Sequence, residues 1–153
     1  MRTHHYALNV RWTGNLGSGT STYRGYSRDH EYHGGEKAPI AGSSDPVFRG
    51  DATRYNPEEL LVGALASCHM LWFLHQCAEA GVVVERYDDT PEGTLLETED
   101  GGGRFTEVVL HPRTAFREPV APALLRQLHD RSHALCFLAN SMNFPVRVEP
   151  VAE

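Results

Sequence analysis

The chain has 153 residues, of which 41% are hydrophobic and 22% are charged, a composition typical of one soluble globular domain. Fourteen Lys and Arg against twenty Asp and Glu give a formal net charge of -6, and no basic run occurs, which argues against nucleic acid and anionic membranes as partners. The amino-terminal residues lack the apolar core of a signal peptide. We therefore expect a single domain over residues 1–153 that is cytoplasmic and does not span a membrane.

The amino-terminal third predicts a β-hairpin followed by a long loop. Tyr6–Trp12 alternates apolar and polar side chains, which is the period of a half-buried strand. Gly14–Gly19 then turns the chain, and Thr20–His33, which is built on tyrosines, is predicted as the second strand. Gly34–Tyr55 is rich in Gly, Ser, Pro and charge, so we expect an ordered loop there, and loops of this length are often functional.

A long central helix is predicted from Pro57 to Ala80. Asn56 can cap the free amides, Pro57 suits the first helical position, and two glutamates follow at the positive end of the helix dipole. Gly81 provides the residue that ends the helix. Residues 60–75 are apolar on nearly every side, which predicts a helix that protein covers on most faces.

A β-meander is predicted after this helix. Its strands are Val82–Asp88, Gly93–Glu99 and Phe105–Thr114, and Gly101–Gly103 forms the tight connection between the last two. Together these strands form one antiparallel sheet in this interpretation.

The carboxy-terminal residues predict a second long helix and a final strand. Pro119 and Pro122 flank the helix start, and apolar residues recur at helical spacing down to Asn140. Phe144–Val151 is predicted as the last strand. This order of elements predicts an α+β fold with two helices packed against antiparallel sheets.

The three cysteines are the candidates for chemistry, because an odd and small number does not suit a disulfide-stapled secreted protein. Cys68 lies midway along the central helix and Cys136 late in the second helix, so helix packing could bring their sulfurs together, although each could also be a small core residue. Cys77 is turned about 180° from Cys68 and lies about 13 Å along the axis, so we interpret it as structural. His75 lies about 10 Å from Cys68 along the axis and is interpreted as a packed or surface histidine.

Other site classes are less favoured by the sequence. Nine histidines raise the alternative of a zinc site, but their spacing matches neither a zinc finger nor His-Glu-x-x-His. The glycines of Gly14–Gly19 precede no helix, so a hairpin turn is preferred to a phosphate loop. We predict neither a metal nor a cofactor.

The pattern as a whole resembles the OsmC/Ohr family, thiol-dependent peroxidases that reduce organic hydroperoxides. Three motifs carry this resemblance: Asn56-Pro-Glu-Glu-Leu60 at a helix start, Ala66-Ser-Cys68 ten residues after Glu58, and Ser132-His-Ala-Leu-Cys136 near the end of the second helix. The resemblance covers essentially the whole chain. It implies an OsmC-like fold and an intertwined homodimer.

The resemblance also implies roles for individual residues. Cys68 would be the peroxidatic cysteine, whose thiolate attacks the peroxide and becomes a sulfenic acid. Cys136 would be the resolving cysteine, which forms a disulfide with Cys68 that an external dithiol or lipoyl-type reductant reopens. Glu58 matches the family glutamate that holds an activating arginine. In a straight helix Glu58 lies about 15 Å along the axis from Cys68, so a site shared between two chains is expected.

The activating arginine does not map cleanly onto this chain. Family members place it in the first hairpin turn or just before the Asn-Pro-Glu motif, and the turn Gly14–Gly19 contains none. We favour Arg28 and rank Arg49 second among the four candidates, Arg24, Arg28, Arg49 and Arg54. A further departure is Phe137, where the best-known peroxidases have proline after the resolving cysteine. A non-catalytic redox sensor or a small-ligand-binding protein with the same fold is therefore the alternative function.

Overall fold

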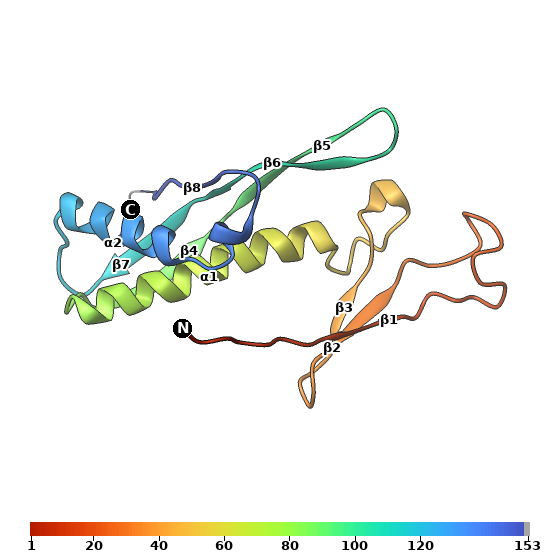
Figure 1. Ribbon diagram of the computed structural model, residues 1–153, viewed down its shortest axis with the longest axis horizontal. Coiled ribbons are helices and arrows are strands. Elements are labelled where there is room, and N and C mark those ends of the chain that lie inside the picture. Colours follow the sequence, from red (N-terminus) through yellow and green to blue (C-terminus); the bar gives the residue numbers. More distant parts are fainter. Residues whose placement is uncertain (152–153) are drawn as a thin grey trace. The chain divides into compact units, whose positions relative to one another are not determined.

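The computed structural model describes residues 1–151; residues 152 and 153, which the expected single domain includes, lie outside the described residues. The described residues form two α-helices and three short sheets, which Figure 1 shows together, so the expected α+β fold is confirmed. The chain forms two compact units, Met1–Leu60 and Leu61–Glu153, and the boundary falls just inside the long central helix.

The first unit contains a three-stranded antiparallel sheet of order β1-β2-β3. Its elements are β1 (Asn9–Trp12), β2 (His30–His33), β3 (Ile40–Gly42) and a short 3₁₀ helix, η1 (Pro46–Phe48). Trp12 lies opposite His30 in the β1–β2 pair. The predicted hairpin is therefore present, although its connection is much longer than a tight turn.

Two predictions for the first unit are wrong in their bounds. Only His30–His33 of the predicted second strand Thr20–His33 is extended. The preceding residues instead form local turns, such as the one closed by the Gly25 amide, which donates to the Thr22 carbonyl oxygen at 3.1 Å. The predicted loop Gly34–Tyr55 contains β3, whose three residues are too few to show a period of two.

The described part of the second unit contains two α-helices and five strands. In chain order they are α1 (Pro57–Glu79, whose first turn lies in the first unit), β4 (Val84–Asp89), β5 (Glu92–Glu97), β6 (Gly103–Leu110), β7 (Pro112–Phe116), α2 (Pro122–Leu135), the 3₁₀ helix η2 (Ala139–Ser141) and β8 (Val146–Val148). The predicted bounds of α1 are confirmed to within one residue. Gly81 has φ 70°, the left-handed conformation that ends a helix, as predicted.

The predicted meander is wrong, because β4 pairs with β7 and β5 pairs with β6. Asp89 lies opposite Pro112 and Glu92 opposite Val109, so both pairs keep one register and form a single long hairpin with a break. Prolines at both sides of the break, Pro91 and Pro112, have no amide for the ladder. The predicted strands Val82–Asp88 and Gly93–Glu99 therefore correspond to β4 and β5, which are the two halves of one interrupted strand.

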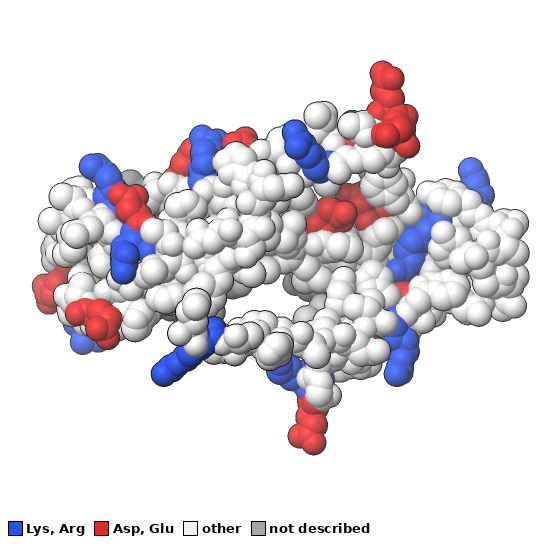
Figure 2. All heavy atoms as spheres, in the orientation of Figure 1, with Lys and Arg blue, Asp and Glu red and all other residues white. Residues whose placement is uncertain are grey.

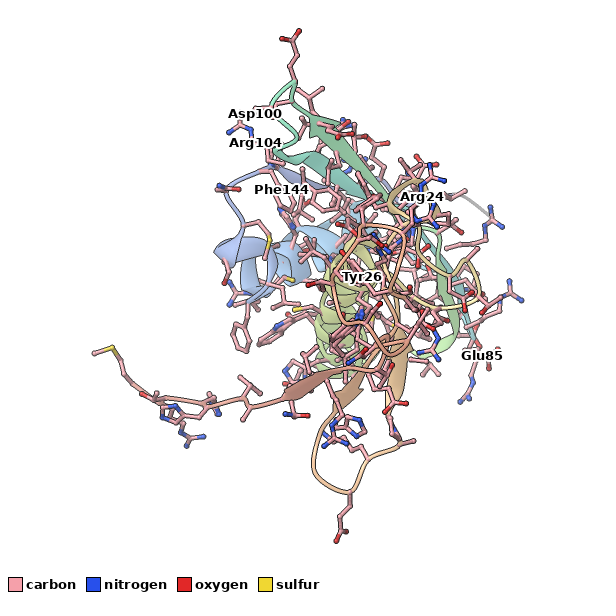
Figure 3. The ribbon with its side chains drawn as sticks, turned by 90° about the vertical axis from the view of Figure 1, so that its right-hand side faces the viewer. Arg24, Tyr26, Glu85, Asp100, Arg104 and Phe144 are labelled. Atoms are coloured by element: carbon pink, nitrogen blue, oxygen red, sulfur yellow. The ribbon has the colours of Figure 1, made fainter. Side chains whose placement is uncertain are left out.

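The hairpin between β5 and β6 extends away from the helices, and Figure 3 labels Asp100 and Arg104 at its outer end. Gly101 has φ 81° in its turn, so the predicted glycine connection is confirmed. β8 lies parallel to β6, with Val146 opposite Val108. Acidic and basic side chains are interspersed on the face shown in Figure 2, without an extended area of one sign.

The buried residues of α1 are Leu65, Ala66, His69, Phe73 and Cys77, and all of them except Ala66 form a stripe spaced four residues apart. Two apolar clusters pack along it, one with the sheet of β5, β6 and β8 and one with α2. The opposite face is open, and Leu71 is 63% exposed. The prediction that this chain covers α1 on most faces is therefore wrong, because one sheet layer and one helix cover only one side. By length and composition α1 could also cross a membrane, as many core helices of soluble proteins could.

The second helix is shorter than predicted and ends at Leu135, not Asn140. Cys136 has φ -67° and ψ 108°, an extended conformation, so it lies just beyond the last helical residue. The Asn140 side-chain amide donates to the Ala134 carbonyl oxygen at 3.1 Å and satisfies one acceptor that the helix end leaves free. The predicted last strand, Phe144–Val151, is extended in β8 only.

Candidate active site

Cys68 and Cys136 meet between α1 and α2. Their sulfur atoms lie 3.0 Å apart, and both cysteines are free thiols. Cys136 is 1% exposed, whereas Cys68 is partly exposed. The structure therefore brings together the two cysteines that the sequence could only suggest as a pair, and Cys68 is the more exposed residue of the two.

The position of Cys68 follows from a well-defined start of α1. The Asn56 side-chain oxygen accepts the Glu59 amide at 2.8 Å, and the Glu59 carboxylate accepts the Asn56 amide at 3.1 Å. This reciprocal arrangement satisfies two amides at the helix start. It fixes the register of α1, and hence the face on which Cys68 lies, three turns later.

Cys136 is held at the end of α2 by its backbone. Its amide donates to the His133 carbonyl oxygen at 3.2 Å. Burial raises the pKa of the Cys136 thiol to about 11, and the hydrogen bond with Cys68 contributes in the same direction. Cys136 therefore keeps its proton at neutral pH and donates it toward the sulfur of Cys68.

Cys77 lies apart from this pair, in the apolar cluster with Phe73 and Leu128. It is 1% exposed, and burial raises the pKa of its thiol to about 11. Burial and pKa are the same for Cys77 and Cys136, so what distinguishes Cys77 is its place in the apolar cluster, whereas the Cys136 sulfur lies 3.0 Å from that of Cys68. The placement agrees with the prediction that Cys77 is structural.

A cluster of aromatic side chains follows the two cysteines in the structure. Trp72 follows Cys68 by one helical turn, and Phe137 directly follows Cys136. Their ring centroids are 5.6 Å apart and their planes meet at 86°. His75, predicted as a packed or surface residue, stands edge-on to Trp72 and lines with it and Leu71 an open cavity of about 320 Å³. Sequence reasoning did not assign this group to the site, although Trp72 and His75 share the Cys68 side of α1.

The arginine candidates differ in how their charges are compensated. The Arg28 guanidinium lies 4.5 Å from the Tyr23 ring centroid and 4.0 Å from that of Tyr26, and it donates to both tyrosine carbonyl oxygens at 2.7 Å. No carboxylate among the described residues pairs with Arg28. It helps to line a cavity of about 390 Å³ in the first unit, together with Trp12 and His30.

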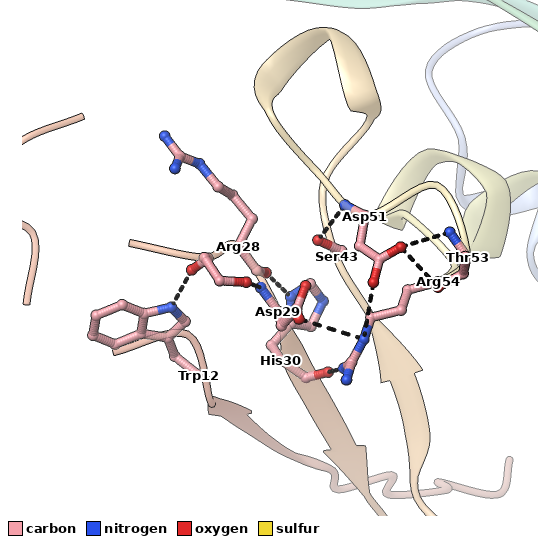
Figure 4. Close-up of polar contacts among 9 residues, drawn as sticks. Trp12, Arg28, Asp29, His30, Ser43, Asp51, Thr53 and Arg54 are labelled. Atoms are coloured by element: carbon pink, nitrogen blue, oxygen red, sulfur yellow. Dashed lines mark hydrogen bonds and ion pairs between the residues drawn. The ribbon is translucent and has the colours of Figure 1, made fainter. Parts of the chain in front are cut away.

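Arg54, by contrast, is surrounded by acids. Its Nε lies 3.6 Å from the Asp29 carboxylate and 3.9 Å from that of Asp51. In Figure 4 the Arg28 guanidinium points away from this ion-pair network. Two other candidates, Arg24 and Arg49, are exposed. Arg28 is thus the partly buried candidate whose charge remains available to a bound anion.

Glu58 is exposed in the first turn of α1. The neighbouring Glu59, not Glu58, closes the helix cap with Asn56. Ten residues of one helix separate Glu58 from Cys68, a rise of about 15 Å. Glu58 therefore cannot contact Cys68 along this helix.

Two buried histidines were missed as a pair by sequence reasoning. His69 Nε2 and His129 Nδ1 lie 3.0 Å apart between α1 and α2. They are 60 residues apart in the chain, and no local pattern links them. The described residues contain no group of three His, Cys, Asp or Glu side chains able to hold a metal ion.

Comparison with known proteins places the chain in a family. A family model described as OsmC-like protein matches residues 50–151. The fold is similar to that of an OsmC-like protein of unknown function from Vibrio cholerae, with 32% identity, coverage of 97% of this chain and 100% of that chain, and a TM-score of 0.87.

More distant structures share the fold. An organic hydroperoxide resistance protein from Legionella pneumophila is 17% identical, with coverage of 100% of this chain and 99% of that chain and a TM-score of 0.70. The organic hydroperoxide resistance protein OhrB of Bacillus subtilis is 18% identical, with coverage of 97% and 98% and a TM-score of 0.63. No curated protein matches the sequence. The family model and the Vibrio cholerae structure show that the chain belongs to the OsmC-like protein family.

Proposed function

We propose that the protein is a cysteine-based peroxidase that reduces organic hydroperoxides. The observation that carries this proposal is the 3.0 Å separation of the Cys68 and Cys136 sulfurs. It is close enough for a disulfide to form with a shift of about 1 Å, since the bond is about 2 Å long. Hydroperoxide resistance proteins among the similar structures support the proposal.

The reaction has three balanced steps. The Cys68 thiolate attacks the terminal oxygen of ROOH, so the O–O bond breaks, the sulfur becomes a sulfenic acid, and the alcohol ROH leaves after taking up a proton. The Cys136 thiol then displaces hydroxide from the sulfenic acid, which forms the disulfide and releases water. An external dithiol, of simple or lipoyl type, reduces the disulfide by exchange and becomes a disulfide itself. No bound cofactor takes part in this scheme.

Activation of Cys68 is assigned in this proposal to Arg28, held in place with the help of Glu58. A guanidinium next to a thiol favours the thiolate. Arg28 suits this role because tyrosine rings and carbonyl oxygens orient it without neutralising its charge. Glu58 cannot reach Cys68 along its own helix, so we assign Arg28 and Glu58 to a site that two copies of the chain share.

A homodimer is supported by the surface of each unit. The first unit buries no large apolar side chain, and it exposes Tyr6, Leu8, Val10, Tyr23 and Tyr55. The second unit leaves one face of α1 open at Leu71. Exposed apolar side chains of this number indicate an interaction surface. A second copy of the chain could cover the apolar residues of the first unit and the open face of α1.

Catalytic turnover of a hydroperoxide distinguishes a peroxidase from the alternative, a non-catalytic redox sensor or small-ligand-binding protein. Purified protein is mixed with cumene hydroperoxide and either dithiothreitol or dihydrolipoamide, and peroxide loss is followed in the parent, Cys68→Ser and Cys77→Ser proteins. The parent and Cys77→Ser should turn over many equivalents, whereas Cys68→Ser should be inactive. A single stoichiometric oxidation without turnover would favour a redox sensor, and equal loss in both variants would contradict the role of Cys68.

A further inference from the structure

A buried histidine pair also joins α1, which carries Cys68, to α2, which ends just before Cys136. His69 and His129 are 0% and 3% exposed, and their ring planes differ by only 6°. The pKa of His69 is lowered to about 3 and that of His129 to about 4, in both cases chiefly by burial. Both rings are therefore neutral at neutral pH and share one N–H···N hydrogen bond of 3.0 Å.

A contribution to the stability of the folded protein does not explain why two histidines occupy these positions. Two neutral imidazoles offer two donors and two acceptors, and one shared bond leaves one of each unused. His69 Nδ1 and His129 Nε2 are indeed buried without a partner among the described residues. An unpaired buried polar group costs about 1–3 kcal/mol, so an apolar pair of similar volume would stabilise this interface more. What the histidines add is a directional link between α1 and α2.

This link lies next to the sulfurs. His69 directly follows Cys68, and His129 precedes Cys136 by seven residues, two turns or about 10 Å of α2. A side chain at the outer radius of a helix moves about 2 Å when the helix rotates by 20° about its axis. Such a rotation of α2 would carry the sulfur of Cys136 out of reach of Cys68, and the hydrogen bond between the histidines opposes it.

We propose that the His69–His129 hydrogen bond positions α2 against α1 so that Cys136 can form the disulfide with Cys68. Both histidines are positioning residues, and this inference rests on the disulfide step of the proposed function. In that step the S–O bond of the Cys68 sulfenic acid breaks, the S–S bond forms, and the proton of Cys136 leaves with hydroxide as water. The hydroperoxide is the oxidant.

The test measures the stability of the disulfide without using peroxide. Protein with Cys77→Ala is equilibrated in buffers of reduced and oxidised dithiothreitol, quenched with acid and alkylated, and the fraction with the Cys68–Cys136 disulfide is counted by mass spectrometry. His129→Leu should lower the equilibrium constant for disulfide formation at least about tenfold, which is a rise of about 30 mV in the two-electron potential.

Conservative variants and a core control distinguish positioning from packing. His129→Asn places an amide near the Nδ1 position, and His69→Gln places one near Nε2. In both variants the equilibrium constant for disulfide formation should stay within about threefold of the parent value. In His69→Leu it should fall as far as in His129→Leu. Phe73→Leu is the control, because Phe73 stacks on His129 at 4.1 Å but makes no hydrogen bond to it. It should lower the free energy of unfolding and leave the potential unchanged.

Each outcome decides something. Unchanged potentials in both leucine variants, or an equal shift in Phe73→Leu, would overturn the positioning role. A parent that forms the disulfide in these buffers but does not turn over hydroperoxide would contradict the proposed function and leave the positioning role intact. A parent that never forms the disulfide would contradict both.

Discussion

The ring of Phe137, directly after Cys136, meets the ring of Trp72, one turn after Cys68, edge to face, with centroids 5.6 Å apart. The contact ties the segment that carries buried Cys136 to the helix that carries the more exposed Cys68. Phe137 is 64% exposed, so the contact lies at the surface, beside the cavity that Trp72 lines. An apolar group of a substrate could lie against these rings.

The first prediction is that these rings bind the organic part of the hydroperoxide. Phe137→Ala and Trp72→Ala should each raise KM for cumene hydroperoxide about three- to tenfold, which is the fold-change that corresponds to the free energy of one edge-to-face ring contact. Both variants should change the turnover of hydrogen peroxide little. Steady-state kinetics with both peroxides measure this. Leu96→Ala, at an exposed leucine of β5, is the matched control. Equal effects on both peroxides would show that the rings support the fold and not the substrate.

The second prediction separates Arg28 from Arg54. Arg28→Gln should lower kcat/KM for hydroperoxide at least about tenfold, because it removes the positive charge that favours the Cys68 thiolate in this proposal. Arg28→Lys should recover only part of this, since an ammonium lacks the planar fork that reaches both carbonyl oxygens. Arg54→Gln should act mainly on stability, because Arg54 is paired with Asp29 and Asp51. The reverse ranking in kcat/KM would move the activating role to Arg54.

The third prediction concerns acid stability. Burial lowers the pKa of His69 from 6.5 to about 3 and that of His129 from 6.5 to about 4. The unfolded chain therefore takes up protons first as pH falls below 6.5, and stability is lost from there down to the folded pKa values. The loss should be at most about 2 kcal/mol for each histidine between about pH 7 and about pH 5.

Urea unfolding at several pH values measures this loss. His129→Leu should give a shallower dependence on pH than the parent, because one buried neutral histidine is gone. Other titrating groups act equally in both proteins and cancel in the comparison. Identical slopes in parent and variant would mean that these histidines are not the groups that titrate.

The fourth prediction tests the shared site. Inactive Cys68→Ser and inactive Glu58→Ala chains are refolded together and assayed for peroxide turnover. Random pairing makes half of the dimers mixed, and each mixed dimer regains one complete site of two, so about a quarter of parent activity should return. Sizing and a tag on one chain verify the mixed dimers. No recovery from verified mixed dimers would contradict a site built from two chains.

The sequence could predict those features that are set locally. The start of α1 depends on Asn56 and on glutamates within its first turn, and its end depends on Gly81, so both were found within one residue. The pairing of β4 with β7 was not found, because it joins residues far apart in the chain across a break at Pro91. Local periodicity shows that strands exist and does not show which strands pair.

The same limit applies to the candidate site. Cys68 and Cys136 were identified one by one, but whether their sulfurs meet depends on how α1 packs against α2. The histidine pair depends on that packing as well. The sequence favours Arg28 among four arginines but does not show how the charge of each one is compensated, and only the structure shows that Arg54 forms ion pairs with Asp29 and Asp51.

The central claim is that Cys68 and Cys136 form a disulfide when the protein meets a hydroperoxide. Reduced protein is treated with one equivalent of cumene hydroperoxide, quenched with acid, alkylated and digested, and its peptides are mapped by mass spectrometry. We predict one crosslink, between the peptides of Cys68 and Cys136, with Cys77 alkylated and full reversal by dithiothreitol. Overoxidised Cys68 with Cys136 still alkylated, or a crosslink through Cys77, would contradict this account.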